Sequence, residues 1–370
     1  MYSDPSCYDS DVAIGTCHNG KGTVNLAFCK ETNKPVVLKK FYLDSAEQED
    51  YNLIEQEIVT MRQMQHPNIL PYLSAFVSGH SLCVVSPLMV YGSCSDLINE
   101  YFPEGLPELA IAYILRDVLE GLEYIHKRGL IHRAIKASHI LISVLGQACI
   151  SGLKYSCERT EHGKWQRNIF SFPKSTAPNL KWLSPELIEQ DLHGYNEKSD
   201  IYSIGVTICE LANGVVPFYD MPETLMLTEK VRGCAPHIID RSTFPRDPED
   251  LDNPEIKPLN GDASHSSLNS MDKRVESLST RKFSEPFHSL TEVCLQRNPK
   301  NRPSVSQLIS HPFFKQCKKN DETLIDILKI VTPIHQRKIE SAAGDENMTV
   351  SVQQLRNLDL ETCQWDFDNT

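Results

Sequence analysis

The sequence lacks an apolar run of about 18 residues, the length that a membrane-spanning helix requires, and it does not open with a signal-peptide pattern. It also lacks an excess of basic residues: 37 Lys and Arg stand against 49 Asp and Glu, and the net charge is −12. This charge argues against nucleic acid or an anionic membrane as the main partner. We therefore expect a soluble protein of the cytoplasm and nucleus.

The twelve cysteines include no C-x-x-C pair, and no His or Cys spacing is typical of a zinc site. Reduced, mostly buried thiols are the expected state, and no metal is expected. Cys17 falls in a predicted surface loop, where a redox-reactive thiol is the alternative to an ordinary one.

Strand patterns come first in the chain and helical patterns follow. Hydrophobic spacing predicts strands at 24–30 and 34–43, two strands within 75–88, and helices at 51–64 and 108–129. We therefore expect an α+β fold in which a small strand-rich unit, residues 1–89, precedes a larger helical unit, residues 90–315.

Three polar segments have little apolar periodicity. Residues 1–11 are expected to be poorly ordered, and residues 240–283, rich in Ser, Pro, Asp and Asn, to form a mostly disordered insertion. Residues 316–370 form a polar tail, in which 322–331 could be a helix and which ends in "CQWDFDNT".

One stretch resembles a catalytic loop without its catalytic groups. Residues 130–141, "LIHRAIKASHIL", match the H-R-D-x-K-x-x-N-[IL]-L pattern of protein kinases. Ala134 stands where the pattern has the catalytic aspartate, and His139 where it has a metal-binding asparagine. In "SGLK", residues 151–154, Gly152 takes the place of the metal-binding aspartate. Alanine cannot orient a substrate hydroxyl, and Mg²⁺ prefers oxygen ligands, so phosphoryl transfer is not expected.

Residues that support the shape of a kinase are retained. "VVLK", residues 36–39, has the form V-A-I-K, and its lysine is expected to pair with Glu57. In "KWLSPEL" and "KSDIYSIG", Glu186 and Asp200 match the acids that tie down the activation segment and the catalytic loop. We expect structural ion pairs at Lys39–Glu57, Glu186–Arg302 and Asp200–Arg133, with Asp200 ordering the His132–Arg133 turn. Together these matches predict a bilobal protein-kinase-like fold, with a β-rich N-lobe and a helical C-lobe.

The glycine-rich loop that would cover ATP is altered. "IGTCHNGKGTV", residues 14–24, has Cys17 where the second glycine is usual. Metal-independent ATP binding is one interpretation, and a cleft that is empty or filled by side chains is the other. Binding would use Ile14, Gly15 and Val24 of the loop, Lys39 and Lys136 as phosphate contacts, and Pro87 and Met89 of the hinge.

The degenerate motifs, with "WLSPE", "GYNEKSDIYSIG" and "ELANGVVPF", closely resemble those of the STRAD (STE20-related) adaptor pseudokinases, the beta type most closely. The resemblance covers nearly the whole chain. It implies a protein that binds and allosterically activates a tumour-suppressor serine/threonine kinase, the liver kinase mutated in Peutz–Jeghers polyposis. It also implies a trimer with an armadillo-repeat scaffold of the mouse protein 25 type, which moves that kinase to the cytoplasm.

The resemblance also implies two partner-binding regions. The terminal W-x-F tripeptide of the family corresponds to Trp365, Asp366 and Phe367, which would dock in the scaffold. The activation segment, roughly 155–183, would face the partner kinase, with Trp165 and Phe170 as candidate anchors. Two other functions stay open: a weak, metal-independent kinase and a module that only senses ATP.

Overall fold

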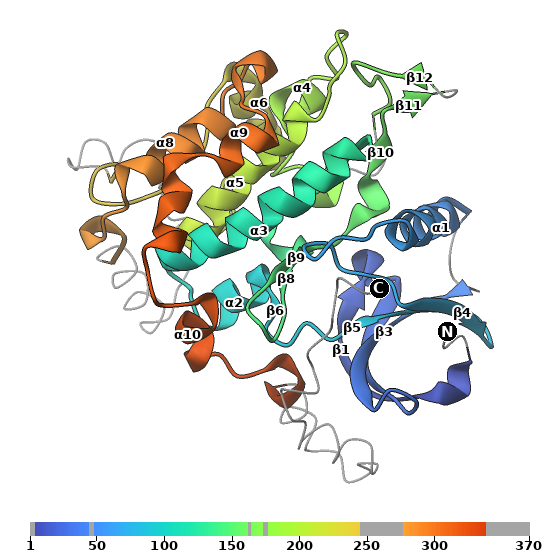
Figure 1. The fold of residues 1–370 in the computed structure, drawn as a ribbon. Coiled ribbons are helices and arrows are strands. Elements are labelled where there is room, and N and C mark those ends of the chain that lie inside the picture. Colours follow the sequence, from blue (N-terminus) through green and yellow to red (C-terminus); the bar gives the residue numbers. More distant parts are fainter. Residues whose placement is uncertain (1–3, 44–47, 162–163, 173–176, 245–276, 338–370) are drawn as a thin grey trace, which may run out of the picture.

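The computed structural model describes residues 4–43, 48–161, 164–172, 177–244 and 277–337. A small lobe built on a curved sheet is joined to a larger, mainly helical lobe (Figure 1). This is the predicted α+β, two-lobed fold. Within the described ranges, no helix combines the length and the apolar character needed to cross a membrane.

The small lobe consists of an antiparallel sheet with strand order β1-β2-β3-β5-β4 and one long helix. Its elements are β1 (Tyr8–Cys17), β2 (Gly22–Cys29), β3 (Lys34–Tyr42), α1 (Gln48–Arg62), β4 (Ser74–Ser78) and β5 (Ser81–Pro87). The predicted hairpin is confirmed, and its register places Val24 opposite Lys39. Because side chains alternate along a strand, the paired residues Leu26 and Val37 share one face of the sheet and pack with Leu88 and Val90.

The first strand begins earlier than expected, and the prediction that residues 1–11 are poorly ordered is wrong for the strand that starts at Tyr8. Tyr8 pairs with Cys29, is buried, and stacks on Phe76 at 5.6 Å between ring centroids. The partner strand lies about twenty residues away, so a local apolar pattern could not reveal this pairing. Cys17 is the last residue of this strand and is half-buried, not in a surface loop, and burial raises the pKa of its thiol to about 11. A reactive thiolate is therefore disfavoured there.

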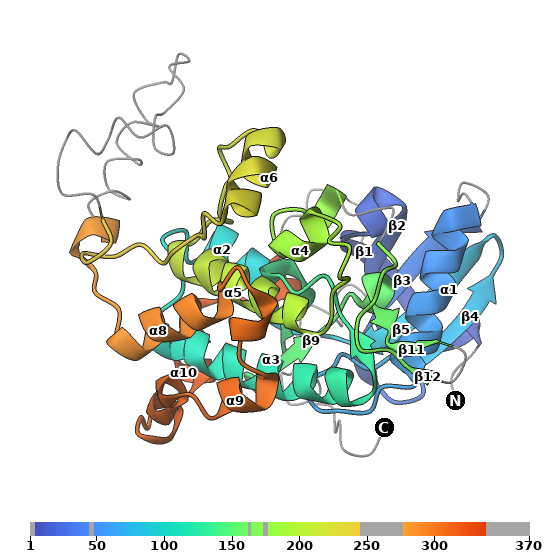
Figure 2. The same ribbon diagram turned by 90° about the horizontal axis from the view of Figure 1, so that it is seen from above.

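The large lobe is organised around a central helix, α3 (Glu108–Lys127). Ile111, Leu115, Val118 and Leu122 follow the helical repeat and are almost completely buried. The strands of this lobe are β6 (Gly92–Ser93), β7 (Leu130–Ile131), β8 (Ile140–Ile142), β9 (Ala148–Ile150), β10 (Cys157–Glu158), β11 (Thr160–Glu161) and β12 (Lys164–Trp165). Its other helices are α2 (Cys94–Glu100), α4 (Pro185–Ile188), α5 (Lys198–Asn213), α6 (Glu223–Arg232), α8 (Glu285–Cys294), α9 (Val305–Ile309) and α10 (Leu324–Ile327). Figure 2 shows α6 standing away from the α3–α5–α8 core.

The described cysteines form no disulfides and are mostly buried, as predicted. All eleven that the structure describes are free, and seven of them are buried.

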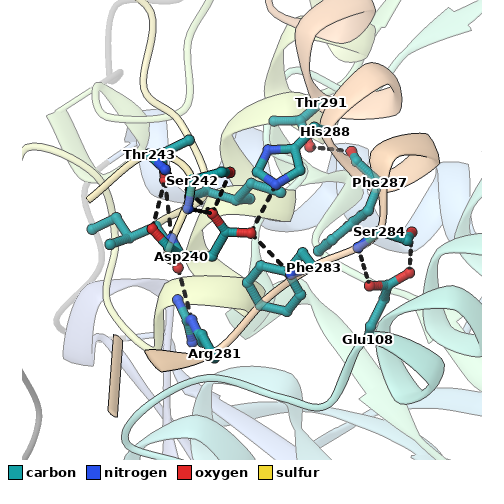
Figure 3. Close-up of polar contacts among 12 residues, drawn as sticks. Glu108, Asp240, Ser242, Thr243, Arg281, Phe283, Ser284, Phe287, His288 and Thr291 are labelled. Atoms are coloured by element: carbon teal, nitrogen blue, oxygen red, sulfur yellow. Dashed lines mark hydrogen bonds and ion pairs between the residues drawn. The ribbon is translucent and has the colours of Figure 1, made fainter. Parts of the chain in front are cut away.

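Both ends of the predicted insertion 240–283 are ordered, which corrects its expected extent; residues 245–276 lie outside the described ones. The Asp240 carboxylate accepts hydrogen bonds from the backbone of Ser242 and Phe283 and contacts His288 Nε2 at 2.9 Å (Figure 3). Arg281 donates to the carbonyl of Ile239. These polar contacts close the base of the insertion, and their long separation along the chain hides them from local sequence patterns.

The predicted tail is partly integrated into the folded body. Helix α10 falls within the expected segment 322–331, and its Leu324 is buried against the large lobe. Further on, Ile334 donates its N–H to the carbonyl of Val90 at 2.8 Å and packs with Leu26 and Val37 of the small-lobe sheet. The chain after α10 therefore bridges the two lobes.

Candidate functional site

The three positions that lack catalytic groups lie together between the lobes. Ala134 follows β7, His139 ends the turn before β8, and Gly152 follows β9. The imidazole of His139 donates from Nδ1 to the carbonyl of Ala134 at 2.7 Å. A Cβ atom added at Gly152 would lie 2.7 Å from the same Nδ1. The predicted grouping of these positions is therefore present.

The His139 ring fills the place where a metal-binding side chain at residue 152 would project. Gly152 has a φ of +84°, and an added Cβ would meet three atoms of the ring within 2.9 Å. Burial lowers the pKa of His139 well below its ordinary value, so the imidazole is neutral. In the part of the chain that the structure describes, no group of three or more His, Cys, Asp or Glu side chains could hold a metal. The residues at this position do not fit a magnesium ion.

No acid or base occupies the position of the catalytic aspartate. Ala134 is completely buried, and its N–H donates to Nδ1 of His132 at 3.2 Å. A methyl group cannot accept the proton of a substrate hydroxyl. The loop therefore keeps its backbone fold without its reactive group.

The predicted lysine–glutamate pair is present, and a tyrosine bridges it. Lys39 Nζ lies 3.7 Å from a Glu57 carboxylate oxygen and donates to the Tyr72 hydroxyl at 2.8 Å. That hydroxyl donates in turn to Glu57 at 2.6 Å. Burial alone would raise the pKa of Glu57, but Lys39, His18 and Tyr72 hold it below its ordinary value. Tyr72 was not identified from the sequence, because it belongs to no fixed-spacing motif.

The loop between β1 and β2 contacts both the hinge and helix α1. Gly15 and Val24 pair across the hairpin, and Ile14 and Val24 pack with the apolar cluster at the hinge. His18, at the tip of the loop, lies with Nε2 3.2 Å from the Glu57 carboxylate. Sequence reasoning missed His18, although it is one residue beyond Cys17 in the same loop.

The predicted hinge residues lie beside this apolar cluster. Pro87 ends β5 opposite Val36, and Met89 is buried in the main core, where its carbonyl accepts from the N–H of Gly92 at 2.9 Å. The described hinge thus borders the apolar faces of both lobes, as an adenine-binding hinge does in a kinase fold.

Two further lysines lie in or near the cleft. Lys136 donates to the carbonyl of Pro178 at 3.2 Å and lies 5.1 Å from the Trp182 ring, so its ammonium faces the activation segment. Burial lowers its pKa to about 8, despite the nearby Glu210. Lys154 is close enough to interact electrostatically with Lys136, His139 and Glu57. Lys154 stands two residues after Gly152 and is a cation that the motif comparison overlooked.

The catalytic loop is held by the predicted buried aspartate. Asp200 accepts hydrogen bonds from the backbone N–H groups of His132 and Arg133, both at 2.8 Å, and contacts His126 Nε2 at 2.8 Å. The expected Asp200–Arg133 ion pair is therefore replaced by a contact with the backbone of Arg133. The Arg133 side chain reaches the activation segment, where it donates to the carbonyl of Tyr155 at 2.5 Å and to that of Ser156 at 3.2 Å. Backbone carbonyls thus satisfy the arginine that, in many kinases, binds a phosphorylated residue.

The second predicted ion pair is buried and bidentate. Arg302 donates to the two carboxylate oxygens of Glu186 at 2.6 and 2.9 Å, and its charge lies 5.0 Å from the Tyr202 ring. Arg302 is 1% exposed and Glu186 is 5% exposed. This fork geometry ties α4, at the end of the activation segment, to the chain after η8 (Pro299–Asn301).

The candidate partner anchors on the activation segment are exposed. Trp165 is 57% exposed and packs under Arg159, whose charge lies 4.9 Å from the indole ring. Phe170 is 62% exposed. Trp365, Asp366 and Phe367 lie outside the described residues.

Comparison with known proteins agrees with the two-lobed fold and with the sequence motifs. A family model described as "Protein kinase domain" matches residues 8–314. Human STE20-related kinase adapter protein alpha is 42% identical over 367 residues, which cover 98% of this chain and 84% of the relative. The mouse alpha protein is 41% identical over 377 residues, with the same coverage of each chain. Mouse STE20-related kinase adapter protein beta is 41% identical over 342 residues, which cover 90% of this chain and 81% of the relative. Both types match, and the family expected from the motifs is confirmed.

Proposed function

Because this chain belongs to the protein kinase family and, within it, to the STE20-related kinase adapter proteins, we propose that it is a catalytically inactive adaptor that binds and activates a serine/threonine kinase. The observation that carries this proposal is that, compared with a catalytic kinase, the metal-binding group is replaced while the contacts that hold the fold are retained. The position of the metal is filled by His139, whereas the contacts of Asp200 and the Glu186–Arg302 pair are intact.

The partner is proposed to be the tumour-suppressor serine/threonine kinase that the sequence resemblance implies. It would dock on the activation segment, where Trp165 and Phe170 offer two exposed aromatic anchors. An armadillo-repeat scaffold would hold the tail through Trp365, Asp366 and Phe367, and the assembly would keep the kinase in the cytoplasm.

The test is reconstitution from purified proteins. Activity of the partner kinase is measured with the scaffold present, with and without this chain. We expect activity to rise with the wild-type chain and to rise less with Trp165→Ala/Phe170→Ala. Val77→Ala is the matched control, because Val77 is 61% exposed but lies on strand β4 of the small lobe. Unchanged partner activity at saturating wild-type chain would refute the proposal.

The proposed absence of phosphoryl transfer has its own assay. Radiolabelled ATP with Mg²⁺ or Mn²⁺ should give no product above that of Lys39→Ala. A signal that depends on Lys39 would instead support a weak kinase. Removal of residues 365–370 should abolish scaffold binding and leave the melting temperature unchanged.

A nucleotide-sensing role is favoured by one observation, the cations Lys39 and Lys154 around a cleft in which no described carboxylate stands at a metal position. Point charges of this kind can bind phosphates without a metal. ATP without metal should then raise the melting temperature of the wild-type chain more than that of Lys39→Met. No shift at millimolar ATP would exclude this role.

A further inference from the structure

The tip of the β1–β2 loop is folded into the cleft. His18 has a φ of +50°, which a residue other than glycine adopts only when its contacts compensate for the strain. Its side chain is 8% exposed, and its ring packs edge-on against Phe41 at 4.7 Å between centroids. The imidazole is therefore held in the interior by specific contacts.

Two side chains of this loop contact the same face of α1. His18 Nε2 lies 3.2 Å from a Glu57 carboxylate oxygen without forming a hydrogen bond, and Lys21 forms an ion pair with Asp50. Asp50 and Glu57 are seven residues apart, so they lie on one side of the helix, two turns from each other. The loop tip thus holds α1 at two points along its length.

The imidazole occupies the region where phosphates would meet the protein. Glu57 contacts His18 on one carboxylate oxygen, and on the other it contacts the Tyr72 hydroxyl and Lys39. His18 also interacts electrostatically with Lys39 and Lys154, the cations that a nucleotide would approach. Burial lowers the pKa of His18 to about 4, so the ring is neutral at pH 7 and carries no charge that would attract phosphate.

We propose that His18 is a built-in occupant of the cleft: it holds α1 inward in the absence of a ligand, and it must leave before a nucleoside triphosphate can enter. The second half of this statement rests on the nucleotide binding proposed above, whereas the first half does not. The position of α1 would thereby be maintained by the chain itself, and a nucleotide would replace this contact.

Hydrogen exchange of the full chain tests the first half. Without nucleotide, His18→Ala should speed exchange of the amides in α1 about tenfold, because the buried ring's contact with Glu57 and its packing against Phe41 are lost. His80→Ala is the matched control, since His80 is an exposed histidine in the turn between β4 and β5, and it should leave α1 unchanged. Equal exchange in His18→Ala and wild type would overturn the proposal. This measurement needs neither nucleotide nor partner, so its failure is distinct from a failure of the adaptor function.

Metal-free titration with ATP and with adenosine tests the second half. His18→Ala should bind ATP about tenfold more tightly than wild type, because the contact that a phosphate must displace is absent, and adenosine affinity should change little. His18→Phe retains the bulk without the contact to Glu57, so it should speed exchange of α1 and leave ATP affinity as low as in wild type. Equal or weaker ATP binding by His18→Ala, or no ATP binding by either protein, would overturn the entry step.

Discussion

Replacement of Gly152 by aspartate restores the residue that kinases use to bind metal, and we expect it to destabilise this chain. The new Cβ would lie 2.7 Å from Nδ1 of His139, and the backbone φ of +84° is in the left-handed region. Both the ring and the backbone are adapted to a residue without a side chain. The substitution therefore tests whether His139 fills the metal position.

The cost has two parts that a control can separate. The left-handed backbone costs an aspartate about 1 kcal/mol, and overpacking against a buried ring costs about 1–3 kcal/mol. The sum, about 2–4 kcal/mol, corresponds to a fall in melting temperature of roughly 3–5 °C for a chain of 370 residues. Gly79→Asp is the control, because Gly79 has a φ of +57° and nothing lies within 4 Å of an added Cβ. Gly79→Asp should therefore show only the free-energy cost of the left-handed backbone.

The assay is denaturant unfolding of both variants, of His139→Asn and of the double variant Gly152→Asp/His139→Asn. Removing the ring should recover at least about 1 kcal/mol of the loss, measured as the interaction free energy of a double-mutant cycle. The double variant should also gain Mn²⁺-dependent ATP binding but no phosphoryl transfer, because Ala134 is unchanged. If Gly152→Asp and Gly79→Asp cost the same, or if His139→Asn recovers nothing, His139 does not fill the site.

Three further predictions concern the contacts that hold the fold. Arg302→Leu leaves the Glu186 carboxylate buried without its partner and should lower the free energy of unfolding in urea by about 3–5 kcal/mol; a loss below about 1 kcal/mol would contradict the buried pair. The pKa of Glu57 is held below its ordinary value of 4.5, so its contribution to stability is complete above that pH and is lost as pH falls through the lower folded value. Melting temperatures measured across acidic pH should therefore fall less steeply for Glu57→Gln than for wild type, and identical slopes would argue against this assignment. Replacement of residues 245–276 by a short Gly/Ser linker should leave the melting temperature nearly unchanged, since Asp240 and Arg281 close the base of the insertion. Asp240→Ala should instead cost about 1–3 kcal/mol, because its buried donors lose their acceptor, and the opposite ranking of the two variants would refute this role.

The sequence alone was sufficient to identify the site residues that belong to motifs with short, fixed spacings. Ala134, His139 and Gly152 were identified by their distance from the H-R pair, and the structure brings them together. Asp200 and Glu186 were identified from their own short motifs, "KSDIYSIG" and "KWLSPEL". Such motifs reflect local backbone geometry, which is determined by residues close together in the sequence.

Contacts between distant segments that no motif specifies could not be predicted. Tyr72 bridges Lys39 and Glu57 through a hydroxyl that no motif specifies. The buried Ile334 follows α10 in a segment that was interpreted as a polar tail, because its apolar partners lie on the small-lobe sheet. Burial of these side chains depends on how the two lobes meet, which hydrophobic periodicity along one segment does not encode.

The retained architecture is held by contacts that the chain makes with itself. In a catalytic kinase, metal, nucleotide and a phosphorylated residue each supply charge that orders the cleft and the activation segment. Here a side chain or the backbone stands at each place: the His139 ring at the metal position, His18 beside Glu57, and the carbonyls of Tyr155 and Ser156 on Arg133. All three replacements are neutral, so they satisfy the shape-holding residues without adding charge that would demand a counterion. A protein of this kind can present an active-like surface at all times, which suits an adaptor better than an enzyme that must cycle between states.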